Sequence, residues 1–494
     1  MTQHLLEQTP AETDQPPNSI FPNEARAYRE QREVHWNREA VATVHRASRQ
    51  YRKRLIDVYR NALSAPGAIL EIGCGKGELI GVLASSGSVG VDFSCEMIKA
   101  ARQAWPQCEF VQADGHEVEL GARHFDTIIL SDVLNDAWDV QQLLATVRRY
   151  STPDTRIVCN FYSHLWSVPL QIAERLGLVT PKLPQNWLTP IDIRNLFALS
   201  GFDIVREWEE ILMPLPLLGF ERLFDRYLVR LPGLRRLALT NFIVARLAPP
   251  IARNQPPSVS VIVAARNEAG HIDELVARIP DMGRGTEIIF VEGNSTDDTY
   301  QAIEKAIAAN PDRAMRLFKQ SGKGKGDAVR AGFDAATGDI LMILDADITV
   351  PPEDLPRFYE AMRTGLGEFI NGVRLVYPMQ DDAMRFFNLL GNRFFSLAFS
   401  WLLGQSIRDT LCGTKVLWAK DYQRIAQGRA YFGDFDPFGD FDLLFGAARQ
   451  GLKIVEVPIR YRARRYGETN IQRWRHGWLL LKMVVFAARR IKFV

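Results

Sequence analysis

Two aspartates, Asp345 and Asp347, come at alternate positions after the apolar run ILMIL at residues 340–344. The run predicts a buried strand, and alternate residues of a strand point to the same side. Two neighbouring carboxylates are costly to bury unless their charge is compensated. Mg²⁺ or Mn²⁺ would compensate both, because these ions prefer oxygen ligands from carboxylates and substrate phosphates. The pair therefore predicts a metal site that stabilises charge on a leaving diphosphate.

A second candidate site lies in the first half of the chain, in the stretch AILEIGCGKGEL at residues 68–79. An acid and three glycines stand there between an apolar run and a predicted helix. Glycines let the backbone turn tightly and approach a ligand closely. The dinucleotide fingerprint GxGxxG would need glycine at position 78, where this chain has Glu78.

The GxGxG spacing after an acid resembles class I S-adenosylmethionine-dependent methyltransferases, and the resemblance covers roughly residues 30 to 245. It implies that Asp92, at the end of the predicted strand in SVGVDFS, accepts hydrogen bonds from the ribose hydroxyls. It also implies that Asp114 contacts the adenine amino group. The implied S-adenosylmethionine-binding residues are Glu71, Gly73, Gly75, Gly77, Asp92, Asp114 and Ser131.

Methyl transfer from a sulfonium needs mainly an aligned nucleophile and sometimes a base. Side chains near the expected loops are candidates for that role: Tyr28, His35, His45, Asp132 and Asp136. The methyl acceptor is not identified. Two other interpretations stay open for this half, namely a domain that binds another nucleotide and a cofactor-binding or docking module without catalysis.

Three segments ahead of and around the two aspartates carry a second resemblance. They are SVSVIVAARNEAGHIDELV from residue 258, EIIFVEGNSTDDTY from residue 287, and SGKGKGDAVRAGF from residue 321. In this order they resemble glycosyltransferase family 2, which has the GT-A fold. The resemblance implies metal binding by Asp345 and Asp347, with a UDP- or GDP-sugar as donor. The implied nucleotide-sugar-binding residues are Ala265, Asn267, Glu268, Glu292, Lys325, Gly326 and Asp345.

The chain departs from the family pattern at two places. Glu292 and Gly293 replace the usual pair of aspartates, which puts base recognition in doubt. Thr349 replaces a glutamine that often follows the second aspartate, which removes one metal contact.

Later segments are similar to the polyprenyl-phosphate sugar transferases of that family, namely RDTLCGTKV from residue 408 and RRYGETN from residue 464. The resemblance implies that Arg464 pairs with phosphate through a bidentate contact. Asp440 or Asp442 is the candidate general base of an inverting displacement. A phosphate acceptor needs that base less, because its second pKa of about 6 leaves it largely dianionic at neutral pH.

These residues require two α/β domains to position them, a Rossmann-like doubly wound fold followed by a GT-A fold. The predicted division is a disordered lead at 1–30, a methyltransferase-like domain at 31–246, a Pro-rich linker at 247–257, a glycosyltransferase domain at 258–472 and a basic amphipathic tail helix at 473–494. Residues 25–63 are charged and helical in pattern and are expected to cap the first site.

Composition excludes several other classes. The 494 residues carry a net charge of +2, which gives no field for nucleic acid. Five dispersed cysteines without a CxxC pair argue against a zinc or disulfide framework and favour a reducing cytosol.

No stretch supplies the roughly 20 apolar residues of a membrane span. In the tail, Trp474, Trp478, Leu481, Val485 and Ala488 recur at helical spacing among basic residues, which favours an interfacial helix on anionic lipid. The stretch at residues 386–404 has a similar mix. Burial of both helices in a core or a homo-oligomer surface is the alternative.

The sequence therefore predicts a bifunctional transferase in the cytoplasm, associated with the cytoplasmic face of the membrane. One half transfers sugar to a polyprenyl phosphate or glycolipid, and the other methylates an intermediate or product of the same pathway. The alternative is a glycosyltransferase acting on a polysaccharide or soluble glycan, with the first half as a non-catalytic module.

Overall fold

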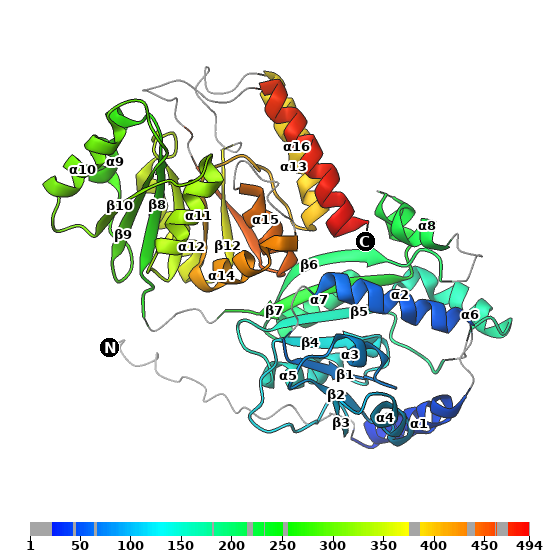
Figure 1. Cartoon of the computed structure of the whole chain (residues 1–494). Coiled ribbons are helices and arrows are strands. Elements are labelled where there is room, and N and C mark those ends of the chain that lie inside the picture. The colour runs from blue at the N-terminus through cyan, green and yellow to red at the C-terminus, as the bar shows by residue number, and fades with distance from the viewer. Residues whose placement is uncertain are drawn as a thin grey trace, which may run out of the picture. The chain divides into compact units, whose positions relative to one another are not determined.

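The computed structural model describes residues 22–42, 46–63, 67–179, 182–214, 221–231, 233–249, 255–374, 386–431, 440–459, 461 and 473–493. The chain forms two compact units (Figure 1). The first comprises Met1–Arg49 and Pro66–Asp203, and the second comprises Gln50–Ala65 and Ile204–Val494. Within the described residues, the strands form two seven-stranded sheets.

The first sheet has the strand order β3-β2-β1-β4-β5-β7-β6. Strands β1 to β5 pair in parallel, and the residues of β1, β2 and β5 are all buried. Burial on both faces explains why these strands read as continuous apolar runs. The bounds are β1 (Ile69–Ile72), β2 (Val89–Asp92), β3 (Glu109–Gln112), β4 (Thr127–Ser131), β5 (Arg156–Tyr162), β6 (Phe202–Glu210) and β7 (Thr240–Leu247).

Helices alternate with these strands along the chain, as a doubly wound fold requires. Capping side chains fix where several of them begin: Ser94, Asp139 and Thr189 each accept a hydrogen bond from the backbone of the first turn. The bounds are α1 (Pro22–Val41), α2 (Arg46–Ala62), α3 (Glu78–Leu83), α4 (Cys95–Ala104), α5 (Val140–Arg149), α6 (Ser167–Arg175), α7 (Pro190–Leu199) and α8 (Glu221–Arg226).

The second sheet has the order β10-β9-β8-β11-β13-β12-β14. It is mixed, because β13 runs antiparallel to both β11 and β12 while the other pairs are parallel. The bounds are β8 (Val259–Ala265), β9 (Thr286–Glu292), β10 (Met315–Lys319), β11 (Ile340–Asp345), β12 (Phe369–Val373), β13 (Lys415–Trp418) and β14 (Ile454–Pro458).

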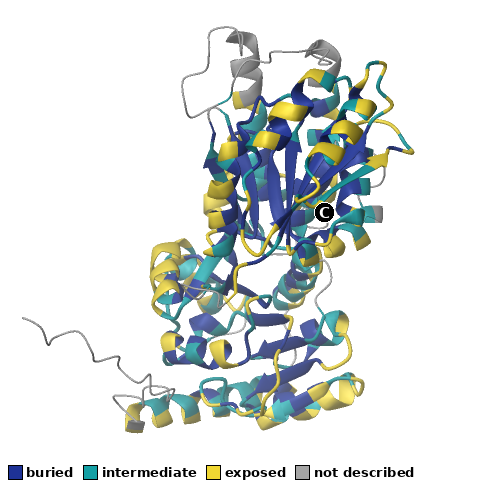
Figure 2. Cartoon of the chain, turned by 90° about the vertical axis from the view of Figure 1, so that its left-hand side faces the viewer, coloured by how far each residue is buried: buried dark blue, intermediate teal, exposed yellow. Residues whose placement is uncertain are grey.

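Alternate residues of β8 and β11 enter two separate cores, one on each face of this sheet. One core is completed by α9 (Ile272–Arg278), α10 (Thr299–Ala309) and α12 (Leu355–Arg363). The other is completed by α11 (Lys325–Ala335), α13 (Phe386–Leu403), α14 (Ala419–Gln427), α15 (Asp440–Arg449) and α16 (Arg473–Ala487). Figure 2 shows the strands as the most deeply buried parts of the chain.

The two predicted folds, Rossmann-like and GT-A, are confirmed at the level of two mixed α/β domains. The compact units divide the chain differently from the predicted domains, since α2 and residues 204–247 group with the second unit. The predicted domain boundaries remain predictions. Among the described residues, no helix is both long and apolar enough to cross a membrane.

In the tail helix α16, the residues buried in the core differ from those of the predicted interfacial stripe. Leu480, Met483 and Ala487 are buried in the second core, against α13. Trp478 and Val485 are exposed, at 61% and 47%. Of the other predicted interfacial residues, Ala488 is buried in the same core, and the side chain of Trp474 lies outside the described residues. The predicted interfacial stripe is therefore only partly exposed.

Candidate functional sites

The glycine-rich turn after β1 takes the conformation that its sequence requires. Gly73, Gly75 and Gly77 all have positive φ, at 74°, 52° and 72°, where other residues are strained. A Cβ at Gly77 would also meet the Phe110 ring at 2.7 Å. The acids hold this turn in place, because Glu71 accepts from the Ile80 N–H at 3.0 Å.

Asp92 links the turn to the second strand. Its two oxygens accept from the N–H groups of Gly75 and Ser94, each at 2.9 Å. Burial raises the pKa of this carboxyl, and the two backbone hydrogen bonds oppose that rise. Burial likewise raises the pKa of Glu71, to about 8. A buried acid with free lone pairs at a strand end can still accept from a ligand hydroxyl.

A cavity opens beside this turn at the carboxyl edge of the first sheet. Three of the seven predicted methyl-donor residues line it, namely Gly73, Asp92 and Asp114. Glu71, Gly75, Gly77 and Ser131 do not line it. Glu71, Gly75 and Gly77 shape the turn instead. Ser131 donates a hydrogen bond to Asn160 at 3.1 Å.

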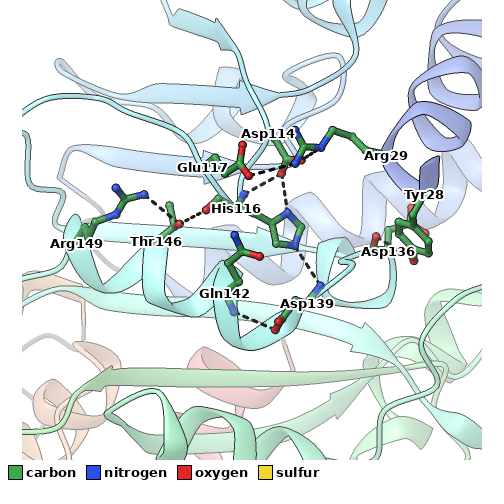
Figure 3. Close-up of polar contacts among 10 residues, drawn as sticks. All are labelled: Tyr28, Arg29, Asp114, His116, Glu117, Asp136, Asp139, Gln142, Thr146 and Arg149. Atoms are coloured by element: carbon green, nitrogen blue, oxygen red, sulfur yellow. Dashed lines mark hydrogen bonds and ion pairs between the residues drawn. The ribbon is translucent and has the colours of Figure 1, made fainter. Parts of the chain in front are cut away.

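Asp114 is the most heavily engaged acid of this cavity (Figure 3). Arg29 of α1 approaches it to 2.5 Å, and the Nδ1 atom of His116 lies at 2.6 Å. Burial opposes its ionisation, but the hydrogen bonds and charges of His116 and Arg29 lower its pKa overall. The Asp139 N–H donates to Nε2 of His116 at 3.4 Å, which leaves the proton on Nδ1, facing Asp114.

Helix α1 lines the cavity with Ala25, Tyr28, Arg29 and Arg32, so the expected cap is confirmed for this helix. No residue of α2 lines it. Arg32 lies 3.6 Å from Asp136 and donates to the Pro184 carbonyl, while its guanidinium stacks on Tyr28 at 3.5 Å.

A second polar cluster stands at the ends of β4 and β5, next to these residues. Asp132, in a left-handed conformation with φ 58°, accepts from the Asn160 amide at 2.5 Å and from the Tyr162 hydroxyl at 3.4 Å. Lys182 donates to the Tyr162 hydroxyl, and its pKa is raised: burial opposes its charge, but Tyr162, Asp132 and Asp136 outweigh burial. The Asp132 carboxylate and the Lys182 ammonium group therefore both hydrogen-bond to the Tyr162 hydroxyl.

The remaining first-half candidates are less informative. His35 contacts the ring of Trp36 at 5.3 Å, and His45 lies outside the described residues. Sequence reasoning missed Arg29, His116, Tyr162 and Lys182. Only His116 carries a local signal, since it stands two residues after Asp114.

In the second unit, the register of the sheet brings the predicted donor residues to one edge. Ala265 is paired with Glu292, and Asp345 is paired with Ala264. Asn267, at φ 57°, accepts from the Thr296 N–H, and Glu268 contacts His271 Nδ1 at 2.9 Å. Glu292 accepts from the Ser295 N–H and is buried, so it orders the turn after β9.

A lysine contacts one of the two aspartates predicted to bind metal. Lys325, at the start of α11 beside Gly326, lies 2.5 Å from Asp345. Burial opposes ionisation of Asp345, but Lys325, Lys415 and Arg374 lower its pKa. Asp347 accepts from the backbone and hydroxyl of Thr349, and its pKa is raised by burial and by the charge of Asp345. The protein's own cations therefore compensate Asp345, whereas burial and Asp345 disfavour the charged form of Asp347. A divalent cation at the pair would favour that charged form.

Gly413 closes the back of this site. A Cβ there would lie 2.5 Å from the Lys325 Nζ atom and 2.7 Å from the Asp345 carboxyl carbon. The segment RDTLCGTKV therefore presses directly on the aspartate and its lysine. No cluster of three metal-ligating side chains occurs in the described part of the chain.

Further cations lie behind Asp345 that sequence reasoning missed. Arg374 binds Asp409 through two hydrogen bonds, at 2.7 and 2.8 Å, and burial leaves Asp409 only 1% exposed. Lys415 is fully buried and donates to the Cys412 carbonyl. Asp409 and Lys415 lie in the segment RDTLCGTKV, but nothing in the sequence joins Arg374 to it.

The predicted catalytic residues are less well defined. Asp442 is paired with Arg429 at 2.7 Å, and no contact within the described residues joins it to Asp345 or Asp347. Asp440 begins α15, but its side chain lies outside the described residues, as does Arg464. Their catalytic roles stay predictions.

Comparison with known proteins agrees with both halves. Residues 260–414 match the family model for glycosyl transferase family 2, and residues 70–159 match a methyltransferase domain. Over 247 residues the chain is 28% identical to a dolichol-phosphate mannosyltransferase of Pyrococcus furiosus, covering 48% of this chain and 67% of that protein.

Two other proteins are similar to part of the chain. An undecaprenyl-phosphate 4-deoxy-4-formamido-L-arabinose transferase of Edwardsiella ictaluri is 26% identical over 216 residues, covering 43% of this chain and 62% of that protein. Glucosyl-3-phosphoglycerate synthase of Mycobacterium tuberculosis, solved with Mn²⁺ and UDP, aligns with a TM-score of 0.36 and 22% identity, covering 48% of this chain and 80% of that one.

Proposed function

We propose that this chain, which combines a methyltransferase domain with a glycosyl transferase family 2 domain, is a bifunctional transferase. The second half moves a sugar from a UDP- or GDP-sugar to a polyprenyl phosphate or glycolipid, and the first half methylates a compound of the same pathway. The observation that carries the sugar-transfer proposal is the meeting of Ala265, Glu292, Lys325 and Asp345 at one edge of the second sheet.

In sugar transfer, Asp345 and Asp347 would hold a Mg²⁺ or Mn²⁺ ion, which when bound would neutralise charge on the leaving diphosphate. Lys325 and the first N–H groups of α11, which has 11 residues, offer further positive charge to the phosphates. A dianionic phosphate acceptor forms the new bond to the anomeric carbon as the bond to the diphosphate oxygen breaks, and no proton has to move. Arg464 is the proposed partner of the acceptor phosphate. With a hydroxyl acceptor, Asp440 or Asp442 takes the proton instead.

Two observations support a lipid acceptor. Relatives named for dolichol phosphate and undecaprenyl phosphate share this half. Apolar side chains also stay exposed on the neighbouring helices α13 and α16, namely Phe394, Leu397, Trp478 and Val485. Exposed aromatic and aliphatic groups near Lys482 and Arg489 suit an interfacial contact with anionic lipid. The proposed place of action is the cytoplasmic face of the membrane.

In methyl transfer, the cavity lined by Asp92, Asp114 and α1 would hold S-adenosylmethionine, which would supply the methyl group. Asp132 is the proposed proton acceptor for a hydroxyl on the methyl acceptor. The Asn160 amide fixes its orientation, and the pair of Tyr162 and Lys182 stabilises its charge.

The test uses the whole protein with polyprenyl phosphate, UDP- and GDP-hexoses, Mg²⁺ and S-adenosylmethionine, read by mass spectrometry of the lipid product. We expect a gain of one hexose that Asp345→Asn abolishes, and a methyl-sized gain that Asp345→Asn leaves intact on a preformed glycolipid. Sugar transfer that survives Asp345→Asn would overturn the metal role. Transfer only to soluble glycan, without methyl release, would support the alternative of a lone glycosyltransferase with a docking module.

A further inference from the structure

Basic side chains gather around one cavity of the second unit that neither proposed reaction uses. Six cationic residues line it: Arg54 of α2, Arg206 of β6, Arg230, Arg449 of α15, and Arg490 and Lys492 of the short π-helix η8 (Ala488–Lys492). Glu210 is the single carboxylate among the described residues that line it. The cavity therefore holds a surplus of positive charge.

Glu210 is already fully occupied by two of these cations. Its carboxylate lies 2.6 Å from Arg230 and 3.3 Å from Arg54, and it also accepts from the Trp208 indole at 3.1 Å. Within the described residues, neither Arg206 nor Lys492 forms an ion pair. The Nε atoms of Arg54, Arg206 and Arg230 are shielded from solvent and lack a hydrogen-bond partner in the described chain.

The surplus positive charge is destabilising when no anion is bound. Burial, followed by the charges of Arg206 and Arg230, lowers the pKa of Lys492 to about 7. Burial also lowers the pKa of Arg206 to about 10. The fold nevertheless makes room for Arg206, because a Cβ at Gly404 would lie 2.8 Å from its side chain. Unpaired cations persist in such a place when an anion completes them.

We propose that this cavity binds a phosphate-type oxyanion, either a free phosphorylated molecule or the phosphate of a lipid headgroup. Guanidinium forks and an ammonium group match phosphate oxygens through charge-assisted hydrogen bonds. Stacking pre-orients two of the arginines, with Arg206 at 4.2 Å from the Trp208 ring and Arg449 at 3.5 Å from the Tyr431 ring.

An adjoining cavity of about 260 Å³ shares Trp208, Arg230 and Lys492 with the first. It has room for the remainder of a phosphorylated molecule. It adds Glu207, Glu209 and Arg235, and Glu209 lies 3.9 Å from Arg235. Arg235 therefore compensates part of the acidic charge of this second cavity.

Calorimetric titration of the whole protein with inorganic pyrophosphate tests the site. EDTA in the buffer suppresses metal-dependent binding at Asp345 and Asp347. We expect saturable binding that Arg206→Gln and Lys492→Met each weaken by about tenfold or more. Arg424→Gln, an exposed position of α14 that lines neither cavity, is the matched control and keeps wild-type affinity. Absence of binding by the wild-type protein, or equal affinity in all four proteins, overturns the proposal.

Thermal unfolding separates binding from a purely structural role. Without anion, Lys492→Met removes an unpaired cation and is expected to leave the midpoint unchanged or raise it, while the midpoint gain with pyrophosphate shrinks. A lowered midpoint together with an undiminished pyrophosphate gain contradicts the proposal. Vesicles containing phosphatidic acid identify the source of the phosphate. If the wild-type protein binds these vesicles, and if pyrophosphate or either variant abolishes that binding, the ligand is a lipid headgroup. If the protein binds pyrophosphate but not the vesicles, the ligand is soluble.

Discussion

Replacing Gly413 by alanine tests whether Asp345 and Lys325 work as one unit. The new methyl group would lie 2.5 Å from the lysine Nζ atom and 2.7 Å from the Asp345 carboxyl carbon, well inside van der Waals contact. The carboxylate must then move by on the order of 1 Å, and such a misplacement at a reacting centre costs about 100-fold in rate. Overpacking of this kind lowers the free energy of unfolding by about 1–3 kcal/mol.

The assay measures sugar transfer and metal-dependent donor affinity in Gly413→Ala. S-adenosylmethionine binding serves as the internal reference, because it belongs to the other unit. Gly428→Ala is the matched control, since a Cβ there meets its nearest atom at 3.5 Å and the residue has an ordinary φ of −82°. Undiminished transfer by Gly413→Ala at wild-type metal concentration would refute the placement of these three residues in one site.

Three further predictions concern single side chains. Asp92→Asn replaces an acceptor of the Gly75 and Ser94 N–H groups, so affinity for S-adenosylmethionine should fall at least about tenfold by calorimetry while sugar transfer is retained; equal affinity would remove Asp92 from the donor site. Burial raises the pKa of Glu71 to about 8, above its unfolded value of 4.5, so the folded protein holds a proton that the unfolded chain has lost between these values. The free energy of unfolding should therefore fall as pH rises from about 5 to 8, by up to about 1.4 kcal/mol per pKa unit, and Glu71→Gln should flatten that slope in urea titrations; parallel profiles would contradict it. Arg374→Met leaves the buried Asp409 carboxylate unpaired and should cost about 3–5 kcal/mol in chemical denaturation, whereas Arg363→Met, in an exposed pair with Glu360, should leave stability nearly unchanged; similar losses in both would contradict the argument.

The sequence was sufficient to predict those site residues whose position depends on their neighbours in the chain. Three glycines with positive φ, the acid Asp92 at the end of β2 and the two aspartates at the end of β11 each follow from neighbouring residues. The sheet register then brings Ala265, Glu292 and Asp345 together, because carboxyl ends of parallel strands meet at one edge.

The sequence was insufficient where partners come from distant segments of ordinary composition. Lys182 reaches Tyr162, and Arg374 reaches Asp409, across 20 and 35 residues, with no repeated spacing to reveal either pair. The tail helix illustrates another limit. This helix is apolar on more than one side, so its sequence does not show which residues pack in the core. Leu480, Met483 and Ala487 do so, and none of them belongs to the stripe predicted to face lipid.

The interleaving of the two compact units affects how the activities can be separated. Because α2 and residues 204–247 group with the C-terminal unit, cleavage at the 247–257 segment would strip that unit of α2, α8, β6 and β7. A fragment beginning at residue 258 would also lack Arg54, Arg206, Arg230 and Glu210. Assigning each reaction to its half therefore calls for single-residue knockouts in the intact polypeptide, since severed halves would confound lost chemistry with lost structure.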